Sequence, residues 1–322
     1  MFPHACSAHA KPITVTRLEA MELRHLRYFL AVAQELHFAR AAQKLHIEQS
    51  PLSRAIKELE EDLGARLFVR TTRTTRLTQA GHLFLECVPR VFDALEQARA
   101  SVRVAAAGYQ GQLRIALSDA IALPRLTALL AQCRQEEPEV DIRLFEMPLS
   151  KQIRGLHDDL YDAGFAQSAE VGDGLLAKAV WSDPLVVAVP ARHPLLMYKR
   201  IPLDEVLRYP LVTCSPQVYE GYGQQIERLL RTADMDPLIL EEVASLDLKL
   251  TLVAAGYALA FVGASQIGTC WRPDVISRPL AGRSPMLTTY LLRRDVDPSE
   301  TLRRFIDRVG PMVKSHRRDH QH

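Results

Sequence analysis

The stretch FARAAQKLHIEQSPLSRAIKELEEDLGARL, residues 38–67, decides how the N-terminal part of this chain folds. Apolar side chains recur in it at i, i+3, i+4 and i+7, the spacing of one helix face, first over residues 38–45 and again over residues 52–63. Residues 46–49 break this pattern. The stretch therefore predicts two short helices joined by a turn, and an apolar stripe over residues 23–36 predicts a third helix that completes a small core.

The polar face of the second helix distinguishes a DNA-reading helix from one member of an ordinary helical bundle. Ser50 and Pro51 suit its N-cap and first position, and Gly64 suits its end. The N-terminal half carries hydroxyl and basic groups, namely Ser50, Ser53, Arg54 and Lys57. The C-terminal half carries acids that would repel phosphates, namely Glu58, Glu60, Glu61 and Asp62. Only the first two turns can therefore enter a major groove, as in a helix-turn-helix protein.

An arginine-rich segment without acids follows this helix. Residues 69–78, VRTTRTTRLT, alternate β-branched and basic side chains, which predicts a short hairpin or wing. The arginines between residues 63 and 85 are Arg66, Arg70, Arg73 and Arg76. Their side chains suit contacts with phosphates and the minor groove. The alternative interpretation is a solvated arginine-rich loop.

Residues 22–86, ELRHLRYFLAVAQELHFARAAQKLHIEQSPLSRAIKELEEDLGARLFVRTTRTTRLTQAGHLFLE, resemble the N-terminal domain of LysR-type transcriptional regulators over their whole length. The family's usual turn reads Ser-Gln-Pro-Pro-Leu-Ser-Arg, and residues 48–54 here read Glu-Gln-Ser-Pro-Leu-Ser-Arg. Glu48 and Ser50 are the departures. The resemblance implies a winged helix-turn-helix domain. The residues that we expect to contact DNA are Gln49, Ser50, Pro51, Ser53, Arg54, Lys57, Arg70, Arg73 and Arg76.

A long helical stretch, residues 78–108, comes after the wing. Its apolar residues step alternately by four and three positions: Phe84, Val88, Val91, Leu95, Ala98, Val102 and Ala105. This heptad seam predicts dimerisation by helix pairing between two chains, and the alternative is a helix packed on its own domain. Pro89 predicts a kink or a helix start near it, because an interior proline costs about 3 kcal/mol. Residues 108–111 suit a hinge.

From residue 112 onward, apolar strand patterns alternate with helical ones. The expected strands cover residues 113–117, 140–146, 161–166, 184–190, 210–213 and 258–263, and the expected helices cover residues 124–135, 151–159, 223–232 and 246–255. Such alternation predicts an α/β fold with parallel sheets covered by helices. The segment resembles the effector-binding domain of the same family, which implies two α/β lobes like those of a periplasmic binding protein, joined by two crossover strands.

The patterns and the resemblance together predict five segments. We expect a disordered extension or an upstream start codon (1–20), a winged helix-turn-helix domain (21–78, with the helix-turn-helix about 38–57), a linker helix (79–108), an effector-binding domain (112–310) and a tail (311–322). In the effector-binding domain, lobe I is expected at about 112–184 and 263–310, and lobe II at about 185–262.

The family's ligand cleft implies contact residues at the ends of strands, where parallel sheets bind ligands. The candidates are Ser118, Asp119, Leu149, Ser150, Phe165, Gln167, Cys214 and Ser215. Helix starts at these places offer free N–H groups that suit a carboxylate, although Asp119 would disfavour an anion. Each candidate also has an alternative interpretation as part of the scaffold.

Composition is compatible with a DNA-binding regulator and excludes few other classes. The formal net charge is only +2, so DNA affinity must come from a focused basic surface. The five cysteines are scattered without a C-x-x-C pair, which predicts a reducing cytoplasm. Cys214 and Cys270 as a redox-sensing pair are the alternative to buried apolar residues. The longest apolar run, residues 250–264, is too short for a membrane span.

The leading hypothesis is a cytoplasmic regulator that binds promoter DNA as a homodimer or homotetramer. It would respond to a small-molecule effector, an aromatic-catabolism metabolite or another small carboxylate, and would contact RNA polymerase. We expect no metal and no cofactor. An enzyme is the second hypothesis, but the sequence contains no Gly-x-Ser-x-Gly elbow and no phosphate loop. The third hypothesis is a ligand-binding module whose basic N-terminal domain contacts proteins.

Overall fold

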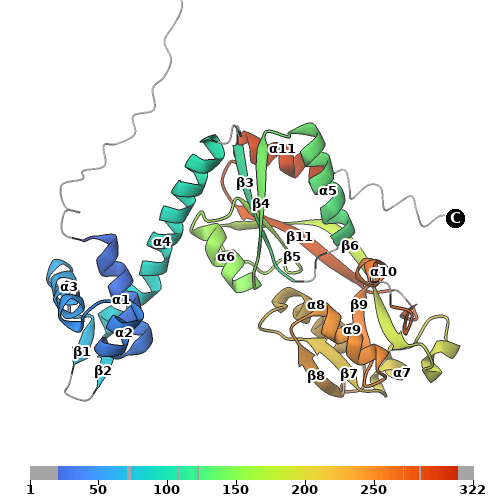
Figure 1. Ribbon diagram of the computed structural model, residues 1–322. Helices are drawn as coiled ribbons and strands as arrows, with labels where there is room; N and C mark the ends of the chain where they lie inside the picture. Colours follow the sequence, from blue (N-terminus) through green and yellow to red (C-terminus); the bar gives the residue numbers. More distant parts are fainter. Residues whose placement is uncertain are drawn as a thin grey trace, which may run out of the picture. The chain divides into compact units, whose positions relative to one another are not determined.

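The computed structural model describes residues 21–70, 74–106, 109, 111–119, 121, 123–270, 272–282 and 284–310. The chain forms two compact units, Met1–Glu96 and Gln97–His322. The boundary between them falls within the long helix α4 (Gln79–Ala106) (Figure 1). None of the helices in the described ranges has the length and the apolar character needed to cross a membrane.

The N-terminal unit contains three helices and a hairpin before α4 begins. These elements are α1 (Leu23–Glu35), α2 (Phe38–Lys44), α3 (Gln49–Asp62), β1 (Phe68–Arg70) and β2 (Thr75–Leu77), and the two strands pair antiparallel. Phe29 of α1 lies in the core, where its ring centroid is 5.4 Å from that of Phe68 and 4.9 Å from that of Phe84. The predicted helices and wing hairpin are therefore confirmed.

The start of α3 lies two residues earlier than predicted. The helix begins at Gln49 and its N-cap is Glu48, so Ser50 is the second helical residue and not the cap. Pro51 then occupies the third position, which is harmless because the first N–H groups of a helix have no partner within it. Gly64 has a φ of +64°, the left-handed conformation that favours glycine after a helix end, as predicted.

Helix α4 is continuous from Gln79 to Ala106 with Pro89 inside it, so the predicted helix start near Pro89 is wrong. Its actual start is set by Thr78, whose Oγ1 accepts a hydrogen bond of 2.9 Å from the Gly81 N–H. Gly81 fits because a Cβ there would lie 2.2 Å from the Leu67 carbonyl oxygen. The expected hinge at residues 108–111 falls largely outside the described residues.

The sheet of the C-terminal unit is mixed rather than purely parallel. Its strands run in the order β10-β6-β11-β5-β3-β4, and β9 pairs with β6 outside this path. The strands are β3 (Gly111–Leu117), β4 (Val140–Glu146), β5 (Ala163–Ala166), β6 (Leu175–Pro190), β9 (Ala260–Gly263), β10 (Val275–Pro279) and β11 (Met286–Arg294). A separate parallel pair consists of β7 (Leu211–Cys214) and β8 (Ile239–Val243). The prediction of parallel sheets holds for β3 with β4 and β5 and for this pair, whereas β6 and β11 run antiparallel to their neighbours.

Strands β6 and β11 pair along their length and connect two lobes, each with its own core. Lobe I carries α5 (Leu123–Glu136), α6 (Leu149–His157) and α11 (Glu300–Val309). Lobe II carries the 3₁₀ helix η2 (Pro194–Met197), α7 (Leu203–Leu207), α8 (Glu220–Leu230), α9 (Leu246–Ala254) and α10 (Ala264–Thr269). In lobe I, α5 and α11 pack around one core and α6 packs around a second one on the other face of the sheet (Figure 1).

Lobe II extends further along the chain than the predicted residues 185–262. Val275 and Leu280 are buried in its cores, and β10 pairs with residues 186–190 of β6. The chain returns to lobe I in β11 and not at residue 263. Strand β6 is also longer than the predicted residues 184–190, because its first half pairs with β11, a strand that lies far away in the sequence.

Candidate nucleic-acid interface and ligand cleft

The first two turns of α3 present an exposed polar surface. Leu52, Ala55 and Ile56 are buried on the opposite face and hold the helix against the core. The predicted contact residues Gln49, Ser50, Pro51, Arg54 and Lys57 are exposed, and Ser53 is half-buried. Lys57 forms an ion pair of 3.3 Å with Glu61, one turn further along the helix. Within the described part of the chain, no side chain pairs with Arg54, so its guanidinium group projects freely from the helix.

Glu60 of α3 has structural partners in and beside the wing. Glu60 accepts hydrogen bonds at Oε1 from the Leu67 N–H (2.8 Å) and the Phe68 N–H (3.0 Å), and its Oε2 lies 3.3 Å from Nη2 of Arg70. One carboxylate therefore fixes the start of the wing on the helix. Sequence reasoning treated Glu60 only as a group that repels phosphate and missed this role.

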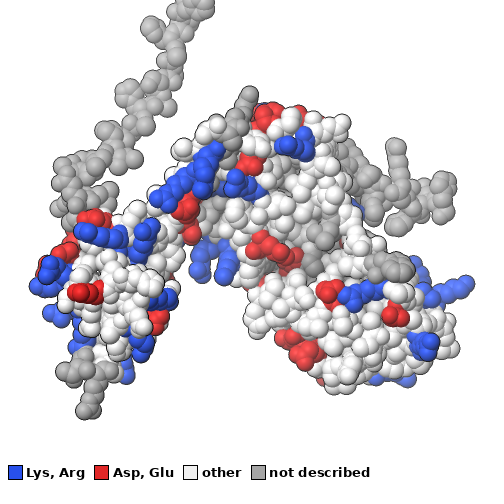
Figure 2. Space-filling model, viewed as in Figure 1, with Lys and Arg blue, Asp and Glu red and all other residues white. Residues whose placement is uncertain are grey.

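The wing arginines differ in their surroundings. Arg70 pairs with Glu60, and its guanidinium carbon lies 4.3 Å from the ring centroid of Phe38, so this side chain is tethered. Arg76 is exposed, and Arg73 lies outside the described residues. On the face shown in Figure 2, Lys and Arg side chains lie along the edges of the N-terminal unit, with acidic side chains between them.

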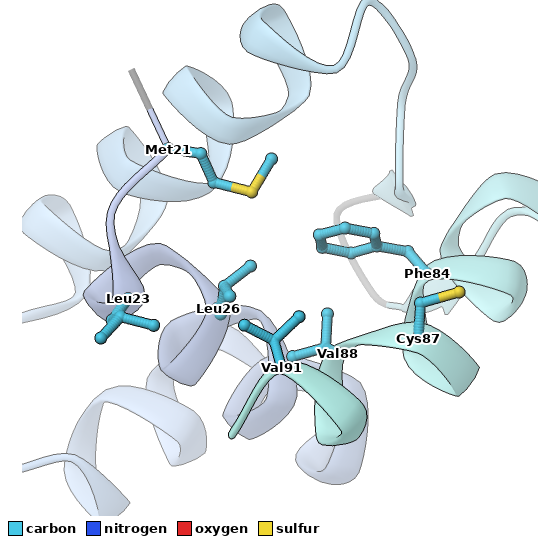
Figure 3. Close-up of a pocket in the computed structure, with 7 residues that line it drawn as sticks. All are labelled: Met21, Leu23, Leu26, Phe84, Cys87, Val88 and Val91. Carbon is cyan, nitrogen blue, oxygen red and sulfur yellow. The ribbon is translucent and has the colours of Figure 1, made fainter. Parts of the chain in front are cut away.

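The predicted seam on α4 divides into two parts. Val88 is only 1% exposed and Phe84 packs on Phe29, so these two positions belong to the core of the N-terminal unit. Val91 and Val102 are 45% and 70% exposed. An apolar hollow of about 310 Å³ lies between α1 and α4, and Figure 3 shows the side chains that line it. They are Met21, Leu23, Leu26, Phe84, Cys87, Val88 and Val91.

In the C-terminal unit, Asp119 joins the two lobes. Its Oδ1 accepts from the Tyr222 N–H (3.0 Å) at the start of α8, and its Oδ2 accepts from the Gln167 N–H (3.0 Å) and lies 3.3 Å from the Ser118 hydroxyl. Burial raises the pKa of the Asp119 carboxyl, while these hydrogen bonds lower it. Gly221 permits the approach, since a Cβ there would lie 2.6 Å from Oδ2 of Asp119.

A second acid bridges the lobes at the start of α6. Oε1 of Glu220 accepts from the hydroxyl of Ser150 (2.7 Å) and from its backbone N–H (3.3 Å). The position predicted to hold a ligand carboxylate is therefore occupied by a carboxylate of the chain itself. Glu220 is not among the residues predicted to line the cleft.

Further hydrogen bonds hold α8 against lobe I. The Gln225 side chain donates to the carbonyls of Gln167 (2.5 Å) and Thr288 (2.8 Å) and accepts from the Thr288 N–H (2.9 Å). The Ser168 hydroxyl donates to the Gln224 side chain (2.8 Å). Because lobe II contributes one helix to all these contacts, a movement of α8 changes the contact between the lobes.

Six of the eight predicted cleft residues are buried, namely Ser118, Asp119, Leu149, Phe165, Gln167 and Cys214. Leu149 is 2% exposed and Phe165 is fully buried, stacked on Trp181 with centroids 4.6 Å apart, so neither presents a surface to an effector. A short central strand is covered on both faces, and its side chains therefore become core. Cys214 is 2% exposed, whereas Ser215 is partly exposed and donates to the Gln217 side chain (2.5 Å).

Two family descriptions match consecutive segments of the chain. Residues 23–82 match "Bacterial regulatory helix-turn-helix protein, lysR family", and residues 106–313 match "LysR substrate binding domain". The chain is 35% identical over 246 residues to the uncharacterized HTH-type transcriptional regulator YnfL of Escherichia coli, covering 76% of this chain and 83% of YnfL. It is 33% identical over 245 residues to the HTH-type transcriptional regulator AlsR of Bacillus subtilis, covering 76% and 81%.

A solved structure with a similar fold is full-length CbnR in complex with its target DNA. The TM-score is 0.73 at 27% sequence identity, and the similarity covers 90% of this chain and 99% of CbnR. The similarity therefore extends over both units of the chain.

Proposed function

We propose that this chain, which belongs to the LysR family of DNA-binding transcriptional regulators, binds promoter DNA through the start of α3. We also propose that it responds to a small molecule in its second domain. The observation that carries the DNA contact is the free, exposed Arg54 on a helix whose acids Glu60 and Glu61 are held by other groups. CbnR, which is similar over both units, was solved with its target DNA. The chain acts as a regulator and not as an enzyme.

We propose that the first turns of α3 read base edges in the major groove and that the wing contacts the backbone. The base-reading set is Gln49, Ser50, Pro51, Ser53, Arg54 and Lys57, and the wing set is Arg70, Arg73 and Arg76. Arg70 has a double role in this proposal, because its pairing with Glu60 also positions the wing. Phosphate contacts place the protein on the duplex and base contacts select the sequence.

We propose that α4 pairs with α4 of a second copy. The exposed Val91, Ala98 and Val102 and the half-buried Leu95 of the seam support this, together with the apolar hollow at Val91 (Figure 3). A homodimer places two α3 helices on two half-sites, and two dimers would form a homotetramer. Val88 is buried and Phe84 packs on Phe29, so these two residues hold the start of α4 on the core of the N-terminal unit.

We propose that the effector enters between the lobes beside Ser118, Ser150, Gln167 and Ser215. A small carboxylate, such as an aromatic-catabolism metabolite, would replace Glu220 at Ser150 and release one of the contacts that hold α8. The effector then shifts the population between two lobe arrangements, which changes how the DNA-bound copies meet RNA polymerase in the cytoplasm.

Arg54→Ala tests the placement of the DNA contact. We expect DNA binding to weaken by about 1–3 kcal/mol, measured by mobility shift with the DNA between the gene for this chain and its divergent neighbour. Arg192→Ala is the matched control, because it removes the same charge from an exposed site in the C-terminal unit. Equal retardation of the DNA by Arg54→Ala, Arg192→Ala and the unmodified protein would refute the proposed role of α3.

A further inference from the structure

A lysine, a cysteine and a tyrosine meet in the interior of lobe II. Lys249 of α9 is 1% exposed, Cys214 at the end of β7 is 2% exposed, and Tyr222 of α8 is 1% exposed. Nζ of Lys249 lies 3.0 Å from Sγ of Cys214, 3.3 Å from the Tyr222 hydroxyl and 3.2 Å from the Phe261 carbonyl oxygen. None of the ion pairs among the described residues includes Lys249, which is unusual for a buried lysine.

Lys249 and Cys214 lie close enough for a proton to pass between nitrogen and sulfur. Burial lowers the pKa of Lys249, since a buried ammonium group is poorly solvated, and the neighbouring sulfur opposes this shift. A thiolate with an ammonium group and a thiol with an amine differ by one proton moved across the 3.0 Å contact. The first form supplies the nucleophilic sulfur and the second supplies the nucleophilic nitrogen.

We propose that Cys214 and Lys249 form a reversible sulfenamide cross-link when the protein meets hydrogen peroxide. The Cys214 thiolate attacks one peroxide oxygen, the O–O bond breaks, and the hydroxide that leaves takes up a proton to become water. Sulfur is thereby oxidised to the sulfenic acid and the peroxide is reduced. The Lys249 amine then attacks the sulfur, an S–N bond forms, and the S–O bond breaks. A second water leaves with a proton from nitrogen, and a thiol reductant reverses the link.

The position of Cys214 makes the reaction specific. The other described cysteines, Cys87, Cys133 and Cys270, have no hydrogen bond with a lysine amine in the part of the chain that the structure describes. Cys214 itself is 2% exposed, and the turn that follows it contains the exposed Gln217, so local opening of this turn is required to admit peroxide.

Formation of the link would affect the contact between the lobes. It turns the Lys249 nitrogen into an uncharged sulfenamide nitrogen with a single N–H, which alters its contact with the Tyr222 hydroxyl. The backbone N–H of the same tyrosine bonds to Asp119 of lobe I. The cluster therefore shares Tyr222 with the contact that holds α8 on lobe I, and oxidation of Cys214 would act on the same helix as the effector.

Mass spectrometry of the full-length protein tests the proposal. After treatment with hydrogen peroxide and digestion without reductant, we expect a cross-linked peptide pair containing Cys214 and Lys249. Its mass should be lower by two hydrogens than the sum of the separate peptides, and dithiothreitol should release it. In Lys249→Met the link should be lost and dimedone, a reagent for sulfenic acids, should label Cys214 several-fold more than in the unmodified protein.

Controls separate this chemistry from general oxidation. Cys270→Ser should leave the link intact, and Arg54→Ala should form it normally even if DNA binding is lost, so the two proposals fail independently. Equal dimedone labelling of Cys214 with and without Lys249 would overturn the proposal. Recovery of Cys214 as a free thiol while Cys87 and Cys270 are oxidised would overturn it as well.

Discussion

Gly221 and Gly223 allow a sharp test of the contact between α8 and lobe I. A Cβ on Gly221 would lie 2.6 Å from Oδ2 of Asp119, 2.8 Å from the Gln167 carbonyl carbon and 3.0 Å from the Ser168 nitrogen. Two of these atoms are backbone, so the helix itself must move. A Cβ on Gly223, two residues further along α8, would meet no heavy atom within 4 Å.

The expected cost of Gly221→Ala follows from these distances. Inserting a methyl group into a packed site costs about 1–3 kcal/mol. A displaced helix also weakens the charged hydrogen bond from Tyr222 to Asp119, a class of bond that contributes about 1.5–3 kcal/mol. We therefore expect the free energy of unfolding to fall by about 3 kcal/mol. Gly223→Ala should raise it by about 0.5–1 kcal/mol, because alanine loses less backbone entropy in a helix.

Urea unfolding followed by tryptophan fluorescence measures this difference. Both tryptophans, Trp181 and Trp271, belong to the C-terminal unit, so the signal reports that unit alone. Trp181 is 2% exposed and stacked on Phe165, and its emission should change strongly on unfolding. If Gly221→Ala is as stable as Gly223→Ala, the close contact between α8 and lobe I does not exist in solution.

Three further predictions concern the seam, the wing and Asp119. Leu95→Glu should convert dimers to monomers in sedimentation. Leu83→Glu is the control and should remain dimeric, because Leu83 is an exposed leucine of the same helix outside the seam. A persistent dimer in Leu95→Glu would reject the seam. Arg76→Ala should reduce the slope of log affinity against log salt by about 0.9, and an unchanged slope removes this arginine from the interface. The raised pKa of Asp119 means that its contribution to stability is present at low pH and is lost as pH rises through the raised value. Relative to Asp119→Asn, the unmodified protein should therefore lose free energy of unfolding as pH rises above the ordinary carboxyl range, and parallel pH profiles would contradict this.

Local patterns predicted the N-terminal unit well. The apolar spacing of α1, α2 and α3 depends on residues within one or two helical turns, and the short hairpin depends on adjacent residues. The start of α3 lies two residues before the predicted one, because Glu48 occupies the N-cap without any side-chain hydrogen bond. A residue that caps only through its backbone leaves no signal in the sequence.

The cleft was harder to predict because its contacts join distant residues. Ser150 and Glu220 are 70 positions apart, and Asp119 and Tyr222 are 103 positions apart. Whether a strand-end residue faces solvent or core also depends on which strands lie beside it, and Phe165 is buried for this reason. The polar candidates lie nearer to the contact between the lobes than the apolar candidates do. All of the polar candidates except Ser215 take part in hydrogen bonds at or beside this contact, namely Ser118, Asp119, Ser150 and Gln167.

The carboxylate of Glu60 fixes the position of the wing relative to α3. Because it accepts hydrogen bonds from the Leu67 and Phe68 N–H groups at the start of the wing, it fixes the spacing between α3 and the wing in the free protein. Less conformational entropy is then lost when the duplex binds. If α3 and the wing contact DNA as proposed, we expect a duplex whose grooves do not match this spacing to deform on binding, which would add selection by DNA shape to selection by base contacts.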